Sequence, residues 1–330
     1  MNPKRSALSA LVAVMMGFLP SAEAAAGGPI VLKLGEDHPK GYPTELGDEE
    51  FARLLGERSK GRMKVEVYPG SQLGEEKAVI EQVQLGAIAL TRVNMSPMGE
   101  FSKPLGVFSL PYVFESSEHM WAFLNGPDGQ KMLDSLKPSR LIGLCYYDSG
   151  ARSFYARKPL TKMEDLKGLK LRVQLSEWAL KTVRAFGANA TPMPYGQVFS
   201  ALQTGVIDGA ENNPPSFFTA SHYQVARHYL LDQHQRVPEI LVMSKVIWDK
   251  LSREDQALVK QAAADSVKKQ RELWDAFERE SLAKVKAGGA IITEVKDLGP
   301  YRKAVKPIID EASAQFGETL KAIEKARPKK

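Results

Sequence analysis

Two arginines and a pair of asparagines in the middle of the chain have the types and positions needed to bind an organic anion. Arg172 lies within residues 169–173, where apolar and cationic residues alternate as in a half-buried strand. A guanidinium on a strand is held rigidly and can bind a carboxylate through two parallel hydrogen bonds. Arg152 follows a glycine turn, and Asn212 and Asn213 end a second short strand. This pattern predicts a carboxylate-binding site rather than a reaction centre.

Other polar and aromatic residues follow predicted strands and are expected to face the same crevice. In two-lobed α/β proteins, ligands bind near the carboxyl ends of strands, where side chains from several loops converge. The predicted ligand-binding residues are Arg172, Arg152, Asn212, Asn213, Glu76, Asn94 and His38, with Tyr195 and Trp178 as a possible wall against the apolar side of a ligand.

Each of these residues also has a purely structural interpretation. Arg172 could pair with an aspartate, and Glu76 could serve only as a favourable charge at a helix N-terminus. Asn212 or Asn213 could cap a turn or the helix that begins at Pro214. The two aromatic residues could belong to the core.

The elements that must position these residues alternate between strand and helix from residue 30 to about residue 209. Strands are predicted at 30–34, 63–68, 88–93 and 141–147, and helices at 51–58 and 75–85. This alternation favours an α/β fold with largely parallel sheets. Because roughly 300 residues exceed what one hydrophobic core usually serves, two lobes with a ligand cleft between them are expected.

A long helix is predicted in the third quarter of the chain. Ser252 is a good N-cap, Glu254 and Asp255 suit the first turn, and Gly288 begins a stop signal. The intervening ~35 residues contain no proline or glycine and would extend ~50 Å. This length exceeds one small domain, so the helix is expected to run along both lobes. A second helix is expected from about 298 to 325.

These elements predict a domain organisation in which the chain crosses between lobes more than once. Lobe I is expected to contain residues 25–150 and about 235–265, and lobe II residues 151–234 and about 290–330. Residues 252–287 are expected to form the helix that braces both.

The first 24 residues are predicted to be a signal peptide. Lys4 and Arg5 form a basic region, residues 7–19 are mostly apolar, and residues 22–24 provide a small-residue cleavage pattern. The ~13 apolar residues are too few to span ~30 Å of hydrocarbon. We therefore expect cleavage near Ala24 and a periplasmic protein.

Composition argues against several other functions. The formal net charge is +6, and no basic stripe interleaved with aromatics suggests nucleic-acid binding. The chain has one cysteine, so no internal disulfide can form. Dinucleotide, phosphate-loop, metalloprotease and nucleophile-elbow motifs are absent, and the five histidines lack zinc spacing. We expect no cofactor, no metal and no catalysis.

Several motifs together resemble the DctP-like periplasmic solute-binding proteins of tripartite ATP-independent periplasmic (TRAP) transporters. The resemblance covers nearly the whole mature chain. It is carried by Gly70-Ser71-Gln72-Leu73-Gly74, Leu110-Pro111-Tyr112, residues 166–173, Thr191-Pro192-Met193-Pro194 and residues 202–212.

The resemblance implies a role for each residue that matches a family motif. Arg172 would make the main carboxylate salt bridge, Arg152 would assist it, and Asn212 would orient the carboxylate. Positions matching His38, Glu76, Asn94 and Tyr195 would line a cleft whose composition varies with the substrate. The family further implies hinge closure around the ligand and delivery to TRAP membrane permease subunits.

One segment departs from the family pattern. Relatives often place an amide in the turn where this chain has Leu175 and Ser176. Contacts between this turn and a ligand therefore stay open.

The cleft residues favour a monocarboxylate with several hydroxyl groups. A dicarboxylate would require a second cation opposite Arg172, whereas Glu76 would repel a distal carboxylate. Glu76, Asn94, Asn213 and His38 can all hydrogen-bond hydroxyls. The Ala-Glu-Asn-Asn and His-Pro sequences resemble the subgroup that binds sugar acids, so a hexuronate such as glucuronate or galacturonate is expected. C4-dicarboxylates are the alternative.

Two other classes of protein share parts of this pattern. An exported enzyme acting on organic acids would need a base or nucleophile at the crevice, and Glu76 with His38 is the pair available for that role. A sensor subunit that reports the ligand to a membrane receptor would use the same site.

Overall fold

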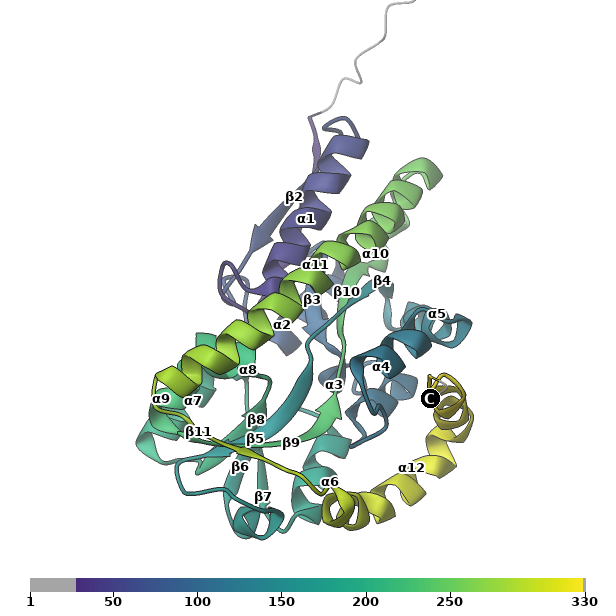
Figure 1. Ribbon diagram of the computed structural model, residues 1–330. Helices are drawn as coiled ribbons and strands as arrows, with labels where there is room; N and C mark the ends of the chain where they lie inside the picture. Colours follow the sequence, from purple (N-terminus) through teal and green to yellow (C-terminus); the bar gives the residue numbers. More distant parts are fainter. Residues whose placement is uncertain (1–27, 329–330) are drawn as a thin grey trace, which may run out of the picture.

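The computed structural model describes residues 28–328, so the predicted signal peptide lies outside the described residues. The chain forms two lobes, each built on one β-sheet and joined by long helices (Figure 1). The sheet of lobe I has five strands in the order β2 (Met63–Tyr68), β1 (Ile30–Gly35), β3 (Leu90–Asn94), β10 (Glu239–Ser244) and β4 (Leu141–Tyr147). The expected two-lobed α/β architecture is confirmed.

The sheet of lobe II has six strands and carries the predicted carboxylate-binding residues. Its order is β11 (Ile291–Glu294), β9 (His228–Arg236), β5 (Ala151–Ala156), β8 (Gly209–Asn212), β6 (Lys170–Val173) and β7 (Asn189–Pro192). Gly209 allows close pairing here, because a Cβ at this position would lie 2.3 Å from the carbonyl oxygen of Tyr155. Gly209, the first residue of β8, thus lets this strand pair closely with β5 and positions Asn212 at its other end.

The expectation of largely parallel sheets is wrong for the strands that carry the chain between lobes. Strand β1 pairs in parallel with β2 and β3, but β10 is antiparallel to both β3 and β4. In lobe II, β5 is antiparallel to β8 and β9. Strand β4 leads into β5, and β9 into β10, through short connections. The outgoing strands β4 and β5 pair with the returning strands β10 and β9, so each pair is antiparallel.

Most helices cover the sheets within one lobe. In lobe I these are α1 (Pro43–Arg58), α2 (Glu76–Leu85), α3 (Met95–Met98), η1 (Lys103–Ser109), α4 (Ser117–Leu124), α5 (Pro127–Asp134), η2 (Lys137–Ser139) and α10 (Lys245–Trp248). In lobe II they are η3 (Met163–Leu166), α6 (Glu177–Ala185), η4 (Tyr195–Gln197), α7 (Val198–Thr204), α8 (Pro214–Thr219) and α9 (His222–Val225). None of the helices within residues 28–328 has both the length and the hydropathy needed to cross a membrane.

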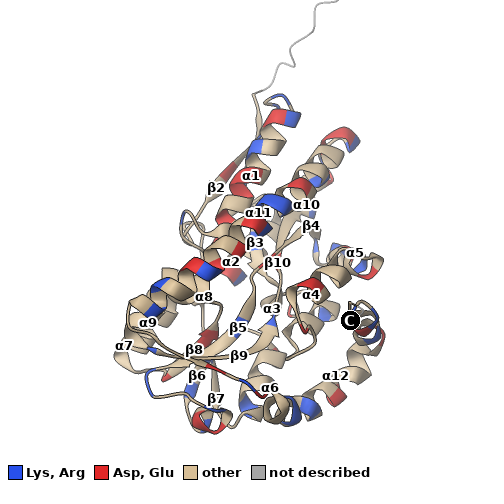
Figure 2. Cartoon of the chain, in the orientation of Figure 1, with Lys and Arg blue, Asp and Glu red and all other residues tan. Residues whose placement is uncertain are grey.

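Helix α11 (Arg253–Ala287) runs along both lobes as one continuous element (Figure 1). Its N-cap is Ser252, whose hydroxyl accepts a hydrogen bond from the backbone N–H of Asp255. The helix packs against α1 and β4 of lobe I and against α8 of lobe II. Basic and acidic residues both occur along its length (Figure 2). Its other side is buried against the lobes, so the helix is amphipathic. Its bounds and two-lobe contacts agree with the prediction.

Helix α12 (Gly299–Lys325) also contacts both lobes, which corrects the assignment of residues 290–330 to lobe II alone. Its first part packs against α6, and its end packs against α4, where His119 Nε2 lies 2.7 Å from the carbonyl oxygen of Ile323. Phe316 has a non-helical backbone at φ −117° and ψ 17°. This break redirects the last turns of the helix onto lobe I.

Candidate functional site

A buried cavity lies between the two lobes, at the ends of β1 and β3 on one side and of β6 and β8 on the other. It gathers every predicted ligand-binding residue except Trp178. The residues that line it are Asp37, His38, Glu76, Arg92, Asn94, Arg152, Arg172, Gln174, Tyr195, Asn212, Asn213, Ser216 and Glu239.

Arg172 is a buried cation whose charge is not neutralised by a direct partner. The residue is 4% exposed, and its Nε donates to the carbonyl oxygen of Met193 at 2.9 Å. Within residues 28–328, no carboxylate lies within 4.0 Å of its guanidinium, and Nη1 and Nη2 form no hydrogen bond. Burial lowers the pKa of Arg172, although a guanidinium remains charged in proteins. Two parallel N–H donors are thus available to an anion in the cavity.

Arg152 is used differently, because its charge is already paired. Its Nε and Nη2 both hydrogen-bond the carboxylate of Glu211, and Nη1 donates to Asn212 Oδ1 at 3.0 Å. The residue belongs to β5, opposite Gln235 of β9, and follows the glycine turn as the sequence indicated. Arg152 lines the cavity and also fixes the orientation of Asn212.

The two asparagines divide the roles that the sequence left open. Asn212 Oδ1 accepts from Arg152 and from the backbone N–H of Asn213 at 2.9 Å, so its amide NH₂ remains available to a ligand. Asn213 instead caps α8, since its Oδ1 accepts from the backbone N–H of Ser216 at 2.8 Å. Its Nδ2 donates to the carbonyl oxygen of Ser149 at 3.0 Å. Asn213 lines the cavity mainly as a structural residue.

The opposite wall, on lobe I, is organised around Arg92, which the sequence analysis did not single out. Arg92 is 2% exposed. Its Nε lies 2.7 Å from Glu36, its Nη1 lies 2.6 Å from Glu239, and its Nη2 hydrogen-bonds both Glu36 and Asp37. Three carboxylates therefore surround the Arg92 guanidinium on the lobe I side of the cavity.

His38 and Tyr195 add an aromatic corner with unused polar atoms. His38 stacks on Tyr42 with ring centroids 3.8 Å apart, and its Nδ1 lies 2.7 Å from Arg92 Nη2. Nδ1 also lies 3.1 Å from Glu36 Oε1, so this nitrogen belongs to the network around Arg92, and Nε2 is the ring nitrogen left for a ligand. The Tyr195 hydroxyl is buried and has no hydrogen-bond partner within residues 28–328. Both groups can hydrogen-bond a ligand hydroxyl.

The cluster of Glu36, Asp37 and His38 has ligand atoms within 4.8 Å of one another, a spacing that could suit a metal ion. Arg92 Nη2 hydrogen-bonds all three side chains. The guanidinium therefore already occupies the position of a cation, and we assign no metal to this cluster.

Comparison with known proteins identifies the family. Residues 34–315 match the family model described as bacterial extracellular solute-binding protein, family 7 (DctP). The chain belongs to this family. Among its relatives, a solute-binding protein of Chromohalobacter salexigens is 38% identical over 275 residues, which is 83% of this chain and 82% of that protein. The C4-dicarboxylate-binding periplasmic protein DctP of Rhodobacter capsulatus is 31% identical over 333 residues, covering 98% of each chain.

Solved structures of family 7 proteins share the fold of this chain. A TRAP periplasmic solute-binding protein from Pseudomonas putida F1 with bound D-glucuronate has a TM-score of 0.89 at 39% identity, covering 91% of this chain and 98% of that one. A TRAP protein from Xanthobacter autotrophicus Py2 with bound β-D-galacturonate has a TM-score of 0.87 at 40% identity, covering 90% of this chain and 100% of that one. The resemblance to DctP-like solute-binding proteins is thus confirmed.

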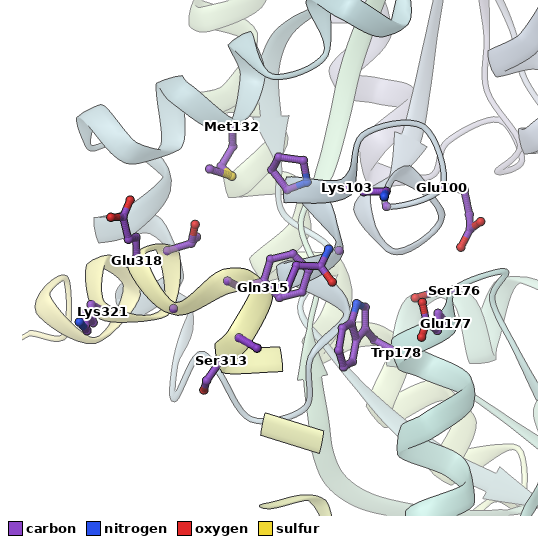
Figure 3. A pocket seen from close by; sticks show the side chains of 17 residues that line it. Glu100, Lys103, Met132, Ser176, Glu177, Trp178, Ser313, Gln315, Glu318 and Lys321 are labelled. Atoms are coloured by element: carbon purple, nitrogen blue, oxygen red, sulfur yellow. The ribbon is translucent and has the colours of Figure 1, made fainter. Parts of the chain in front are cut away.

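Trp178 is the predicted site residue that this family 7 protein does not place in the cavity. It packs edge-on against Phe316 with centroids 5.6 Å apart, and Lys181 Nζ lies 4.6 Å from its ring centroid. Figure 3 shows it in a separate groove formed by α6, α12 and the segment around Lys103. Ser176 caps α6, and the first turn of that helix directs Trp178 towards α12. Its predicted role as a wall of the ligand site is therefore wrong.

Besides Arg92, the cavity residues outside the predicted set are Asp37, Gln174, Ser216 and Glu239. Gln174 and Glu239 were missed for different reasons. Gln174 follows Arg172 by two positions at the end of β6 and lines the cavity, so it supplies the amide that Leu175 and Ser176 lack. The period of two along a strand could have indicated it. Glu239 begins β10 and lies opposite Asn94 of β3. Nothing in the sequence signals this antiparallel pairing between distant segments.

Glu76 is expected to be protonated at neutral pH. Its Oε1 accepts from the backbone N–H of Asn94 at 2.6 Å. Burial, reinforced by the negative charge of Asp37, raises the pKa of Glu76 to about 8. A neutral Glu76 can donate a hydrogen bond to a ligand hydroxyl and adds no charge to the lobe I wall.

This pKa makes the stability of the ligand-free protein depend on pH. Between the ordinary value of 4.5 and about 8, the folded protein holds a proton on Glu76 that the unfolded chain has lost. The free energy of unfolding therefore falls as the pH rises through this range, by up to about 1.4 kcal/mol per pH unit. We expect Glu76→Gln to remove this part of the dependence in urea unfolding at pH 5 to 8. Exposed Glu49→Gln is the matched control, and equal pH slopes for wild type and Glu76→Gln would contradict the assignment.

Proposed function

We propose that this protein captures a hexuronate, such as D-glucuronate or D-galacturonate, in the periplasm and delivers it to a TRAP permease. The observation that carries the proposal is Arg172, a buried guanidinium whose two terminal nitrogens have no partner within residues 28–328. A buried charge without a counter-ion is costly, and a ligand carboxylate would neutralise it. Solved relatives with bound D-glucuronate and β-D-galacturonate support the substrate class.

In the proposed complex, the two lobes bind opposite ends of the ligand. The carboxylate lies on Arg172, with the free amide of Asn212 and the amide of Gln174 beside it. The hydroxyl groups of the sugar face Glu76, Asn94, His38 and Tyr195. Each direct hydrogen bond between a charged group and the ligand contributes on the order of 1.5–3 kcal/mol.

Ligand capture is proposed to proceed by closure of the lobes. Tyr42 of lobe I contacts Ser216 of lobe II at 2.9 Å between their hydroxyl oxygens, so the lobes already touch beside the cavity. A ligand that contacts both walls binds the closed state more tightly than the open one, and therefore shifts the population towards closure.

A dicarboxylate remains the alternative ligand, because Arg92 supplies a cation opposite Arg172. The relative from Rhodobacter capsulatus binds C4-dicarboxylates by its name. The carboxylates around Arg92 favour the sugar acid, since they would repel a second carboxylate. We also propose that the site binds its ligand without catalysis, because the acids that line it already have partners: Asp37 and Glu239 bond Arg92, and Glu76 bonds the backbone N–H of Asn94.

A thermal-shift screen of refolded, ligand-free protein tests the proposal. The ligands are D-glucuronate, D-galacturonate, D-gluconate, succinate and L-malate, each in excess. A ligand at 100 times its Kd stabilises the native state by about 2.7 kcal/mol, which corresponds to a rise in melting temperature of several degrees. We expect this rise with uronates. A rise with succinate or malate alone would contradict the uronate assignment, and turnover of a bound acid would indicate an enzyme.

A further inference from the structure

The two walls of the cavity carry opposite charge. Lobe II contributes two arginines, Arg152 and Arg172, and one carboxylate, Glu211, which pairs with Arg152. On lobe I, Arg92 faces the carboxylates of Glu36, Asp37 and Glu239. In formal charge, the lobe II wall has one positive charge in excess, and the lobe I wall has two negative charges in excess. The cavity is therefore polarised along the line between the lobes.

The contacts of Arg92 explain why this second arginine is not a second anion site. A guanidinium has five N–H donors. Nε and Nη2 are directed at Glu36, Nη2 also at Asp37, and Nη1 at Glu239. No edge of the guanidinium offers two free parallel donors to a ligand carboxylate. Of the three carboxylates, Asp37 and Glu239 line the cavity, whereas Glu36 lies behind them.

We propose that Glu239 and Asp37 are specificity-determining residues that prevent Arg92 from binding a second carboxylate. The site then accepts sugar acids with one carboxylate and rejects aldarates, which carry a carboxylate at both ends. This inference rests on the proposed function, because it requires a ligand carboxylate on Arg172. It goes further by naming the residues that exclude a chemically similar class of ligand.

The expected effect follows from simple electrostatics. A carboxylate and a ligand carboxylate about 6 Å apart, at an effective dielectric constant of about 20, repel by enough to change affinity roughly a hundredfold. Solvent and protein relaxation reduce this, so about tenfold per removed charge is a conservative expectation. Glu239→Gln keeps the size of the side chain and an oxygen that can accept from Arg92 Nη1. Asp37→Asn likewise keeps the size of the side chain and an oxygen that can accept from Arg92 Nη2. This side chain is less buried, at 10% exposed.

The test compares D-glucarate with D-glucuronate, and D-glucarate with its uncharged-end analogue D-gluconate, by isothermal titration calorimetry at pH 7. Wild type is expected to bind glucarate at least about a hundredfold more weakly than glucuronate. In Glu239→Gln and in Asp37→Asn, we expect this ratio of Kd values to fall at least about tenfold. Glu66→Gln, which removes a half-buried carboxylate paired with Lys64 on β2 and outside the cavity, is the matched control and should leave the ratio unchanged.

Three results would overturn the inference. They are wild-type glucarate binding as tight as glucuronate binding, a ratio unchanged within about twofold in a folded variant, or an equal fall of the ratio in Glu66→Gln. If both variants fail to fold, the test compares glucarate with its monoamide on the wild-type protein. The monoamide lacks the second charge and is expected to bind at least about tenfold more tightly than glucarate. Equal affinities would again refute the inference. Absence of any uronate binding to wild type would instead refute the proposed function itself.

Discussion

Arg172→Met is expected to abolish uronate binding without destabilising the ligand-free protein. The wild-type guanidinium is buried, its pKa is lowered by burial, and it has no carboxylate partner in the described part of the chain. Removing it therefore relieves an uncompensated charge, while the ligand loses two charge-assisted hydrogen bonds. We expect affinity for D-glucuronate to fall at least about a thousandfold, or about 4 kcal/mol. The melting temperature of the free protein is expected to stay constant or rise.

Calorimetric titration and thermal unfolding of the same preparation measure both effects. Arg172→Lys keeps the charge but loses the bidentate geometry, so we expect binding about ten- to a hundredfold weaker than wild type. Near-wild-type affinity in the lysine variant would remove Arg172 from the site. A large drop in the stability of free Arg172→Met would show that the residue is structural.

Arg92→Met is expected to reduce mainly the free energy of unfolding, whereas Arg172→Met reduces mainly the affinity for the ligand. The substitution leaves Glu36, Asp37 and Glu239 buried together without a counter-ion. Removing one partner of a buried ionic network typically costs about 3–5 kcal/mol. The Arg92 guanidinium also holds the pKa of Glu36 well below its ordinary range, against the opposing effect of burial. That contribution to stability is lost in the variant at neutral pH.

Urea unfolding at pH 7 measures this loss directly. Arg172→Met is the matched control, because it deletes an arginine of similar burial from the facing wall of the same cavity. The acid range gives a second check. Protonation of the carboxylates removes the repulsion in the variant, so the gap in stability between wild type and Arg92→Met is expected to narrow as the pH falls. Equal stability of the two arginine variants at pH 7 would contradict the distinction between a ligand-binding and a structural arginine.

Much of the fold could be predicted because its signals are local. Strands β2 and β4 have the bounds that alternation and apolar runs predicted, and α11 begins after the predicted cap, Ser252. The mixed strand directions could not be predicted, since they depend on how the chain passes between lobes. The break at Phe316 in α12 lies beside Gly317, a residue type that weakens helices, but the sequence does not show that the turns after it pack on the other lobe.

The lobe II half of the candidate site was predicted more completely than the lobe I half. Arg172 and Asn212 lie at the ends of short strands with recognisable patterns. Arg92 was overlooked because a single charge in a buried strand gives no sign of its partners. Glu239, one of those partners, is 147 residues away in the chain. Trp178 was misplaced because it lies on the face of α6 that packs against α12, which its residue type does not reveal.

The continuous helix α11 links the unfolding of the two lobes. Its apolar side is buried partly against α1 and β4 and partly against α8, so neither lobe has a complete hydrophobic interface of its own. Unfolding of one lobe would expose the helix surface that supports the other. We therefore expect the two lobes to unfold as one cooperative unit, although they form separate sheets.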